Sequence, residues 1–444
     1  MYTKTMSFKI IIVFILLFVG LTLRWHDMGS IYRIRDDEHS WLLAGTSLLQ
    51  HYEPTSWTIR WPYYQWSLYK KVEFKKFPGS NQTAYALVTP WLDHPPLFAA
   101  LIGGWTLFTG NNNLQYPNWF VLRQPMIVMS VATLGLTFLV IRKLFNEKFA
   151  IYTLAAYTFF PAAVVSSRFI LAENAIPLWL MASLLSLHIV LSDTSQKIQR
   201  RAFSILLILC YTAPLLKLSG FVVPASVVLI LLLQQKYKHA GFTAIVAAIS
   251  LLSFIAYGWW FSWDIFIGTN SAHMLRPQSF SNFWSLFYQK SVANIPFLDP
   301  SLVAGFIGLC MLLAQPFTKA RQFIFVPFFL AVISLLVIAP IDSYTWYKFP
   351  LYPLLAIGVG WILYEFQKGT PVFVVLLLPM IAWTAEKGLT LEQNHRKLFV
   401  FILSIFFVLI LLLPDRFSWL KNKMRQGVII LLFGLETLWI WNLP

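Results

Sequence analysis

The densest group of charged side chains in the sequence is the run Arg33-Ile34-Arg35-Asp36-Asp37-Glu38-His39. Three adjacent carboxylates repel one another when all are charged, so something must offset them. The flanking arginines, a bound metal ion, or the use of one carboxylate as a general base could each do so. The alternative without chemistry is a helix whose first turn carries solvated acids, because negative charge is favourable at a helix N-terminus.

Three further groups combine cations and acids later in the chain. Asp93-His94-Pro95-Pro96-Leu97 holds an acid and a histidine in front of two prolines, which predict an extended entry to a helix. Arg168 and Glu173 flank a short turn between two apolar runs, and Lys217 and Lys348 lie within or beside such runs. A lysine there is costly unless it has an anionic partner. The alternative for the Asp93 group is a helix N-terminus without chemistry, and for the others it is a structural ion pair or a side chain that reaches the membrane surface.

Composition indicates what kind of protein must position these groups. The chain has 444 residues, of which 58% are hydrophobic and only 12% are charged, and its mean hydropathy is +0.65. A soluble domain carries about 25% charged residues, so the chain is not a water-soluble globular protein, a disordered chain or a disulfide scaffold. The two cysteines, Cys210 and Cys310, lie in apolar runs, which argues against a disulfide and a thiol nucleophile. We predict an all-α polytopic membrane protein.

The formal net charge of +16 follows from 34 Lys and Arg against 18 Asp and Glu. The basic residues are scattered between apolar runs and form no cluster, so the pattern does not indicate a nucleic-acid partner. Cytoplasmic loops of membrane proteins collect Lys and Arg, which accounts for the excess.

Apolar runs recur along the whole chain and predict about thirteen transmembrane helices. They lie at about 8–23, 121–141, 149–166, 174–192, 203–216, 218–234, 240–261, 301–318, 322–340, 346–366, 371–386, 397–414 and 427–443. Two loops with polar residues interrupt them, at 26–120 and 262–300. We therefore expect a first module of seven spans over 1–261, a second outer loop at 262–300 and a C-terminal transmembrane module over 301–444.

The loop charges predict the orientation of these spans. With a cytoplasmic N-terminus and an uncleaved first span, the short inner loops hold most Lys and Arg, as the positive-inside rule requires. Most acids, including those of the first cluster, then lie outside. This scheme holds only if the apolar stretch 95–110 does not cross, and its length of about 16 residues is short for a span.

The first outer loop predicts amphipathic helices at the membrane surface. Residues 38–51 would form one that lies in the interface, with Asp37 as its N-cap. Its polar arc would consist of His39, Ser40, Thr46, Ser47, Gln50 and His51, and its apolar arc of Trp41, Leu42, Ala44, Leu48 and Leu49.

In this scheme acids and cations gather beside lipid at the outer membrane level. They are Asp36, Asp37, Glu38, His94, Arg123, Arg168, Glu173, Lys217 and Lys348. A lipid-linked phosphate as substrate would use both signs, because cations bind phosphate and a carboxylate can take a proton from the incoming nucleophile. A transporter or lipid flippase is the alternative from another class. Transporters tend to have inverted repeats and ionisable residues at the bilayer midplane, whereas the groups here lie mostly at span ends.

The sequence resembles the GT-C glycosyltransferases of the protein O-mannosyltransferase and lipid A aminoarabinose transferase type. Asp37-Glu38 resembles their acidic pair after the first span, and Asp93-His94-Pro95-Pro96-Leu97 is close to their His-Pro-Pro-Leu or Lys-Pro-Pro-Leu motif. The remaining motifs follow in the family's order, namely Arg123, Arg142-Lys143-Leu144-Phe145, Arg168 through Asn174, Lys217-Leu218-Ser219-Gly220 and Tyr347-Lys348-Phe349-Pro350-Leu351-Tyr352-Pro353. The resemblance covers residues 1–366.

The resemblance implies a GT-C fold and a mannosyltransferase-like enzyme of the cell envelope. It would move a hexosyl or pentosyl unit, with inversion, from undecaprenyl or dolichyl phosphate to a hydroxyl of a glycan, lipid or protein acceptor. The first module, over 1–261, would be the catalytic one, and its active site would face the extracytoplasmic side of the cell membrane. An oligosaccharide ligase that uses another lipid carrier is a second alternative.

The resemblance also implies roles for single residues. Asp37 is the expected base, with Asp36 and Glu38 beside it as further catalytic candidates. The expected ligands of the donor phosphate are Arg123, Arg168, Lys217, Tyr347 and Lys348. His94, Asp93 and Glu173 are expected to hold the acceptor or a divalent cation, although no spacing demands a metal and no other cofactor is expected.

Overall fold

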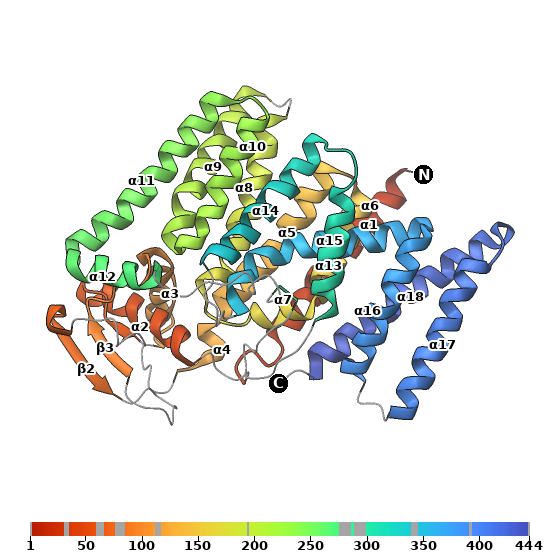
Figure 1. Cartoon of the computed structure of the whole chain (residues 1–444), viewed down its shortest axis with the longest axis horizontal. Helices are drawn as coiled ribbons and strands as arrows, with labels where there is room; N and C mark the ends of the chain where they lie inside the picture. Colours follow the sequence, from red (N-terminus) through yellow and green to blue (C-terminus); the bar gives the residue numbers. More distant parts are fainter. Residues whose placement is uncertain are drawn as a thin grey trace.

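A computed structural model of the chain describes residues 2–30, 35–58, 66–75, 85–111, 117–192, 195–274, 286–287, 299–338, 345–389 and 393–442. The fold is mostly helical (Figure 1). The helices of the first 261 residues are α1 (Tyr2–Trp25), α2 (Arg35–His51), α3 (Pro96–Phe108), α4 (Trp119–Leu122), α5 (Gln124–Leu144), α6 (Glu147–Phe159), α7 (Pro161–Ser166), α8 (Ile176–Leu191), α9 (Gln196–Leu216), α10 (Val222–Leu233) and α11 (Tyr237–Phe261). They are followed by α12 (Trp263–Met274), α13 (Pro300–Leu313), α14 (Lys319–Ile338), α15 (Tyr352–Lys368), α16 (Pro371–Gly388), α17 (Gln393–Leu412) and α18 (Ser418–Asn442).

Helices occupy all thirteen predicted apolar runs, and one of these runs is divided into two helices. The run at 149–166 is broken at Phe160 into α6 and α7, because Pro161 begins a new helix. The expected division at Lys217 is confirmed, since a short 3₁₀ turn η4 (Leu218–Phe221) separates α9 from α10.

Among the described residues, seven helices are long and apolar enough to cross a membrane. They cover 119–144, 172–191, 237–261, 319–337, 347–368, 371–388 and 418–442. Four shorter apolar helices lie at 96–108, 218–233, 300–313 and 398–412. The chain is therefore a multi-pass membrane protein, while the total of thirteen crossings and the division into three modules stay predictions.

The first outer loop contains a small sheet that the all-α prediction missed. Strands β1 (Ser56–Thr58), β2 (Lys71–Lys75) and β3 (Tyr85–Thr89) pair antiparallel in the order β1-β3-β2. Figure 1 shows these strands beside α2, α3 and α12, below the lower ends of α9 to α11. The sheet and α2 form one small structured cap, because β1 contacts α2 through the hydrogen bond from Ser56 Oγ to the Ser40 carbonyl, 2.7 Å long.

The predicted polar arc of residues 38–51 is mostly covered by protein, with only Gln50 and His51 of its six residues exposed, and the position of this helix in the membrane interface stays a prediction. The helix begins at Arg35, so Asp37 lies in its first turn rather than at the N-cap. Its polar residues His39, Ser40, Thr46 and Ser47 are all buried, with at most 6% of each exposed. The hydroxyls of Ser40, Thr46 and Ser47 donate to backbone carbonyls, which is why burial is tolerated.

Helices α2 and α3 touch through glycines at their crossing. A methyl group on Gly45 would lie 1.8 Å from the Ala99 carbonyl oxygen, and one on Gly103 would lie 2.2 Å from the Gly45 carbonyl carbon. At 13 residues, α3 is about 20 Å long, which is less than the roughly 30 Å of a bilayer core. Its length and its packing on α2 support the predicted non-crossing of 95–110.

We expect Gly45→Ala to destabilise the protein by at least about 1–3 kcal/mol, because the added methyl must push two backbones apart. The control is Gly104→Ala on α3, where the nearest atom, Leu49 Cδ1, is 3.8 Å from the added methyl. Thermal unfolding in detergent should show a lower midpoint for Gly45→Ala than for the wild type. The midpoint of the control should not change. Equal midpoints for the two variants would contradict this packing.

Candidate functional site

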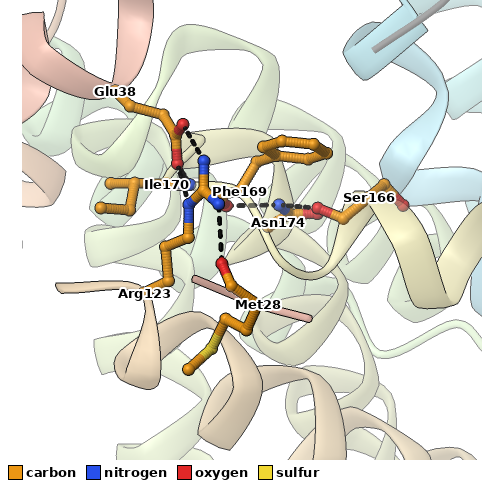
Figure 2. Close-up of polar contacts among 7 residues, drawn as sticks. All are labelled: Met28, Glu38, Arg123, Ser166, Phe169, Ile170 and Asn174. Atoms are coloured by element: carbon orange, nitrogen blue, oxygen red, sulfur yellow. Dashed lines mark hydrogen bonds and ion pairs between the residues drawn. The ribbon is translucent and has the colours of Figure 1, made fainter. Parts of the chain in front are cut away.

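Glu38 and Arg123 form a buried ion pair that joins α2 to the start of α5 (Figure 2). Arg123 Nε donates to Glu38 Oε1 over 2.9 Å, and Nη2 donates to Oε2 over 2.6 Å. The remaining nitrogen, Nη1, donates to the Met28 carbonyl at 2.7 Å, and Glu38 Oε1 also accepts from the Ile170 amide at 2.9 Å. Both side chains are fully buried.

This pairing argues against two of the predicted roles. Arg123 was expected to bind the donor phosphate, and Glu38 to take part in catalysis, but each directs its polar atoms at the protein. The Arg123 guanidinium also lies 5.1 Å from the ring centres of Trp119 and Phe169. The pair instead fixes three segments distant in sequence, namely the residues after α1, the start of α2 and the turn at 167–171.

The turn that follows α7 is held by Asn174, as Figure 2 shows. Asn174 Nδ2 donates to the carbonyls of Ser166 and Phe169, over 2.7 and 2.8 Å. Within this turn Arg168 is fully buried, and its Nη2 donates to the Leu23 carbonyl at 2.7 Å. Among the described residues, Arg168 Nε and Nη1 have no hydrogen-bond acceptor. Burial, together with the nearby charges of Arg24 and Arg123, lowers the pKa of Arg168 to about 10.

Lys217 is the centre of a second group of charged side chains. Its ammonium donates to Glu173 Oε1, and Glu173 is itself fully buried. The Lys217 nitrogen also lies 5.6 Å from the ring centre of Tyr347 and 6.0 Å from that of Trp41. Burial alone would lower the pKa of Lys217, but the charges of Glu173, Tyr347 and Asp37 raise it above its ordinary value. Lys217 is therefore a cation paired with Glu173 and stabilised further by the charge of Asp37.

Two histidines lie beside Lys217. The His94 ring stacks on Trp41 with 4.9 Å between centres and faces the His273 ring at 5.5 Å. Burial, then the charges of Lys217 and His273, holds the pKa of His94 well below its usual range. Burial and Lys217 likewise lower the pKa of His273 to about 3. Both imidazoles are thus neutral near pH 7 and can donate or accept hydrogen bonds.

Asp37 differs from Glu38 in exposure. It is half-buried in the first turn of α2, whereas Glu38 is closed off from solvent. The side chain of Asp36 lies outside the described residues. Asp93 is half-buried and accepts a 3.2 Å hydrogen bond from Thr58 Oγ1, which ties the segment before α3 to β1. Asp37 is therefore the carboxylate that lies both near Lys217 and within reach of solvent.

Lys348 follows Tyr347 in the 3₁₀ turn η6 (Thr345–Leu351) but belongs to a third buried group. Its charge acts on Asp299, the N-cap of α13, which accepts from the amides of Ala162 and Ser301 at 2.8 Å each. Burial raises the pKa of Asp299 to about 6, although those amides and Lys348 oppose it. Ser301 Oγ donates at 2.9 Å to Glu436, a fully buried acid of α18. Tyr347 therefore belongs to the Lys217 group, whereas the next residue, Lys348, belongs to the Asp299 group.

The part of the chain that the structure describes contains no evident set of ligands for the predicted divalent cation. No group of three or more His, Cys, Asp or Glu side chains there could hold a metal ion. Glu173 Oε2 has no hydrogen-bond partner within that part, so it can accept a substrate hydroxyl or a cation from outside. Metal dependence stays a prediction.

Sequence reasoning missed His273, Arg24, Asp299 and Glu436 as members of these groups. Glu436 carried a usable signal, because an acid inside an apolar run is costly and marks a polar partner. Arg24, at the end of α1, donates to Ser130 Oγ at 2.7 Å and is fully buried. His273 carries no such signal, because it lies in the 262–300 loop and nothing in the sequence connects this loop with Lys217.

Acid is expected to destabilise the protein through His273. Unfolded His273 binds a proton below its ordinary pKa of 6.5, while in the folded protein it does so only near pH 3. The free energy of unfolding should therefore fall as pH drops through this window, by up to about 1.4 kcal/mol per pH unit. Melting curves between pH 7.5 and 5 should be less pH-dependent for His273→Gln than for His51→Gln, an exposed histidine on α2. The same dependence of melting temperature on pH for the two variants would contradict a role of His273 in the loss of stability in acid.

Comparison with known proteins finds a similarity to one family over part of the chain. Residues 93–260 match the family model described as dolichyl-phosphate-mannose-protein mannosyltransferase. This range contains the motifs from Asp93 to Lys217 and ends with α11. No curated protein matches the sequence.

The fold is similar to that of ArnT from Cupriavidus metallidurans. The undecaprenyl phosphate-bound structure of that protein aligns with a TM-score of 0.58 at 14% identity, over 99% of this chain and 77% of that one. Its apo structure aligns with a TM-score of 0.59 at the same identity and coverage. The oligosaccharyltransferase of Archaeoglobus fulgidus, with an acceptor peptide tethered, gives 0.48 at 10% identity, over 95% of this chain and 55% of that one. The likeness to ArnT shows a shared fold.

Proposed function

We propose that this chain is a membrane glycosyltransferase of the dolichyl-phosphate-mannose-protein mannosyltransferase type, which transfers one sugar from a polyprenyl phosphate to an acceptor hydroxyl. The match of residues 93–260 to that family model supports the proposal. The donor class rests on the fold shared with ArnT, whose structure contains undecaprenyl phosphate. The reaction takes place at the level of the membrane surface, beside α2, α3 and the sheet. In the predicted orientation this side of the protein is extracytoplasmic.

The observation that carries the proposal is the convergence of Asp37, Glu173 and Tyr347 on Lys217. An ammonium between acids at the membrane level suits a substrate that is an anion with a hydroxyl partner. Asp37 is the proposed base, because it is the accessible carboxylate of the group. Glu38 lacks that access and is instead a positioning residue, since its pair with Arg123 fixes the helix turn that carries Asp37.

The proposed step is a direct displacement at the anomeric carbon. Asp37 takes the proton of the acceptor hydroxyl, and the acceptor oxygen forms the new bond to that carbon from the face opposite the phosphate. The bond from the carbon to the phosphate oxygen breaks, and its electron pair leaves with the polyprenyl phosphate. Lys217 is proposed to stabilise the charge that grows on the phosphate, with Tyr347 beside it and Arg168 as a further cation. Inversion at the sugar follows from this geometry of attack.

Glu173, Asp93 and His94 are proposed to orient the acceptor. Glu173 Oε2 is free of partners in the described part of the chain, and neutral His94 can share a hydrogen bond with a hydroxyl. Lys348 is not placed in this step, because its neighbour is Asp299.

The test is release of free polyprenyl phosphate in proteoliposomes, with a panel of polyprenyl-phosphate sugars as donors and crude membranes as acceptor. Release from one donor, with the sugar recovered on the acceptor in inverted configuration, is the expected result. Donor movement between leaflets without release would indicate a flippase instead. Release only from a pyrophosphate-linked oligosaccharide would indicate a ligase, and no release from any donor by folded protein would overturn the proposal.

A further inference from the structure

A pocket of about 340 Å³ lies at the end of α8, α9 and α11 that is farthest from Lys217. Glu173 comes just before α8, and Lys217 comes just after α9. These helices have 16 and 21 residues, which corresponds to about 24 and 32 Å. The pocket is lined where α8 ends and where α9 and α11 begin, so it is about one bilayer core away from the candidate site. Figure 1 shows these ends together at the top of the molecule.

The lining of this pocket is basic at its rim and apolar on one wall. The main side chains are Arg200 and Lys236, which are exposed and form the rim, together with Gln196, Gln199, Phe203 and His239. The Phe203 and His239 rings meet edge to face, 4.6 Å apart. Gln199 Nε2 donates to the Ser192 carbonyl at 2.8 Å, which holds the end of α8 to the start of α9. These two contacts therefore fix the helix ends that form the pocket.

No described acid neutralises the rim. Arg200 and Lys236 are exposed, and among the described residues neither has an ion pair. The lining residues include no Asp or Glu. Asp193, the single acid in the connection between α8 and α9, lies outside the described residues. Two cations that have no acid partner among the described residues, together with the Phe203 ring, suit a phosphate carried on an apolar body.

Exposed apolar side chains lie within about one helical turn of lining residues, which indicates that the pocket is at lipid level. Ile198 is 50% exposed on α9, Leu233 is 46% exposed on α10, and Tyr237 and Phe242 are 65% and 60% exposed on α11. A volume of 340 Å³ is at the lower end of that of small-ligand pockets, which is sufficient for a glycerophosphate headgroup. Basic pockets between spans on the cytoplasmic side hold anionic lipid headgroups. We propose that this pocket binds the phosphate headgroup of an anionic phospholipid in the leaflet opposite to the Lys217 site.

The test is native mass spectrometry of the full-length protein in detergent, with phosphatidylglycerol, phosphatidylcholine and a polyprenyl phosphate added separately. The variant Arg200→Ala/Lys236→Ala removes the two rim cations. The matched control, Lys197→Ala/Lys238→Ala, removes two exposed cations from the same helix ends that do not line the pocket. Each basic residue near a lipid phosphate is worth about fivefold in affinity, so the rim variant should bind phosphatidylglycerol about 25-fold more weakly.

The expected result is preference for phosphatidylglycerol over phosphatidylcholine, lost in the rim variant and kept in the control. Equal loss in both variants, with unchanged melting temperatures, would overturn the proposal in favour of general surface charge. Tighter binding of polyprenyl phosphate than of phosphatidylglycerol would overturn the phospholipid assignment. Displacement of the lipid by millimolar inorganic phosphate would indicate a site for a free anion and would also count against it.

Discussion

Asp37→Asn is expected to lower the rate of sugar transfer by about 10²- to 10⁴-fold, the contribution of a well-placed general base. Asparagine has the same shape as aspartate but cannot take the proton of the acceptor hydroxyl. Asp37 is half-buried and makes no part of the Glu38 ion pair, so its replacement should leave the fold intact. Donor binding should also persist, because the proposed phosphate ligand is Lys217. The measurement is single-turnover release of polyprenyl phosphate, with donor affinity measured in parallel.

Asp36→Asn is the matched control, since it makes the same chemical change one residue earlier on the same helix. Near-normal release from this variant, together with loss in Asp37→Asn, would assign the base. The reverse pattern would keep the glycosyltransferase mechanism and move the base to Asp36. Loss of donor affinity in Asp37→Asn would instead mean that Asp37 acts by holding Lys217, whose pKa its charge helps to raise.

The helices could be predicted from sequence because a bilayer imposes a strong signal. A span needs a long apolar run, and each of the thirteen runs is helical in the structure. The sheet was missed because its strands are short and lie in a polar loop. Lys71–Lys75 does alternate polar and apolar residues, which was a usable sign of a strand. The orientation of α2 could not be predicted, because helical periodicity shows which residues share a face but not what covers that face.

The site was predictable in its residue types and much less so in its partners. Lys217 was expected to need an anion, and the structure supplies Glu173, 44 residues earlier in the chain. Arg123 and Glu38 are 85 residues apart, so nothing local indicated that they would be paired. By residue type alone, Asp37 and Glu38 are neighbouring acids that could each act as a base, and the expectation for Asp37 came from the family resemblance. Only tertiary structure separates them, because consecutive helical residues point about 100° apart and one of them is turned into the protein.

The second prediction concerns the Glu38–Arg123 pair, because this pair is what distinguishes Glu38 from Asp37. Glu38→Gln leaves the Arg123 charge buried without a counter-charge, and Arg123→Gln does the same to Glu38. Breaking a buried pair in this way costs about 3–5 kcal/mol, because the desolvation of the remaining charge is no longer offset. Both single variants should therefore unfold at markedly lower temperature in detergent. The double variant Glu38→Gln/Arg123→Gln removes both charges and should be less destabilised than the sum of the two, since amides can still hydrogen-bond each other.

The exposed pair of Lys9 and Glu147 provides the control for this cycle. Its atoms approach to 2.7 Å, nearly as close as the buried pair, but its side chains are 51% and 32% exposed. Solvent screens such a pair, so Glu147→Gln should cost at most about 1 kcal/mol. Sugar transfer at a temperature where all variants are folded then separates the two roles of Glu38. If Glu38→Gln is stable but inactive, Glu38 takes part in the reaction itself; if activity is lost only as the protein unfolds, it positions Asp37 through Arg123.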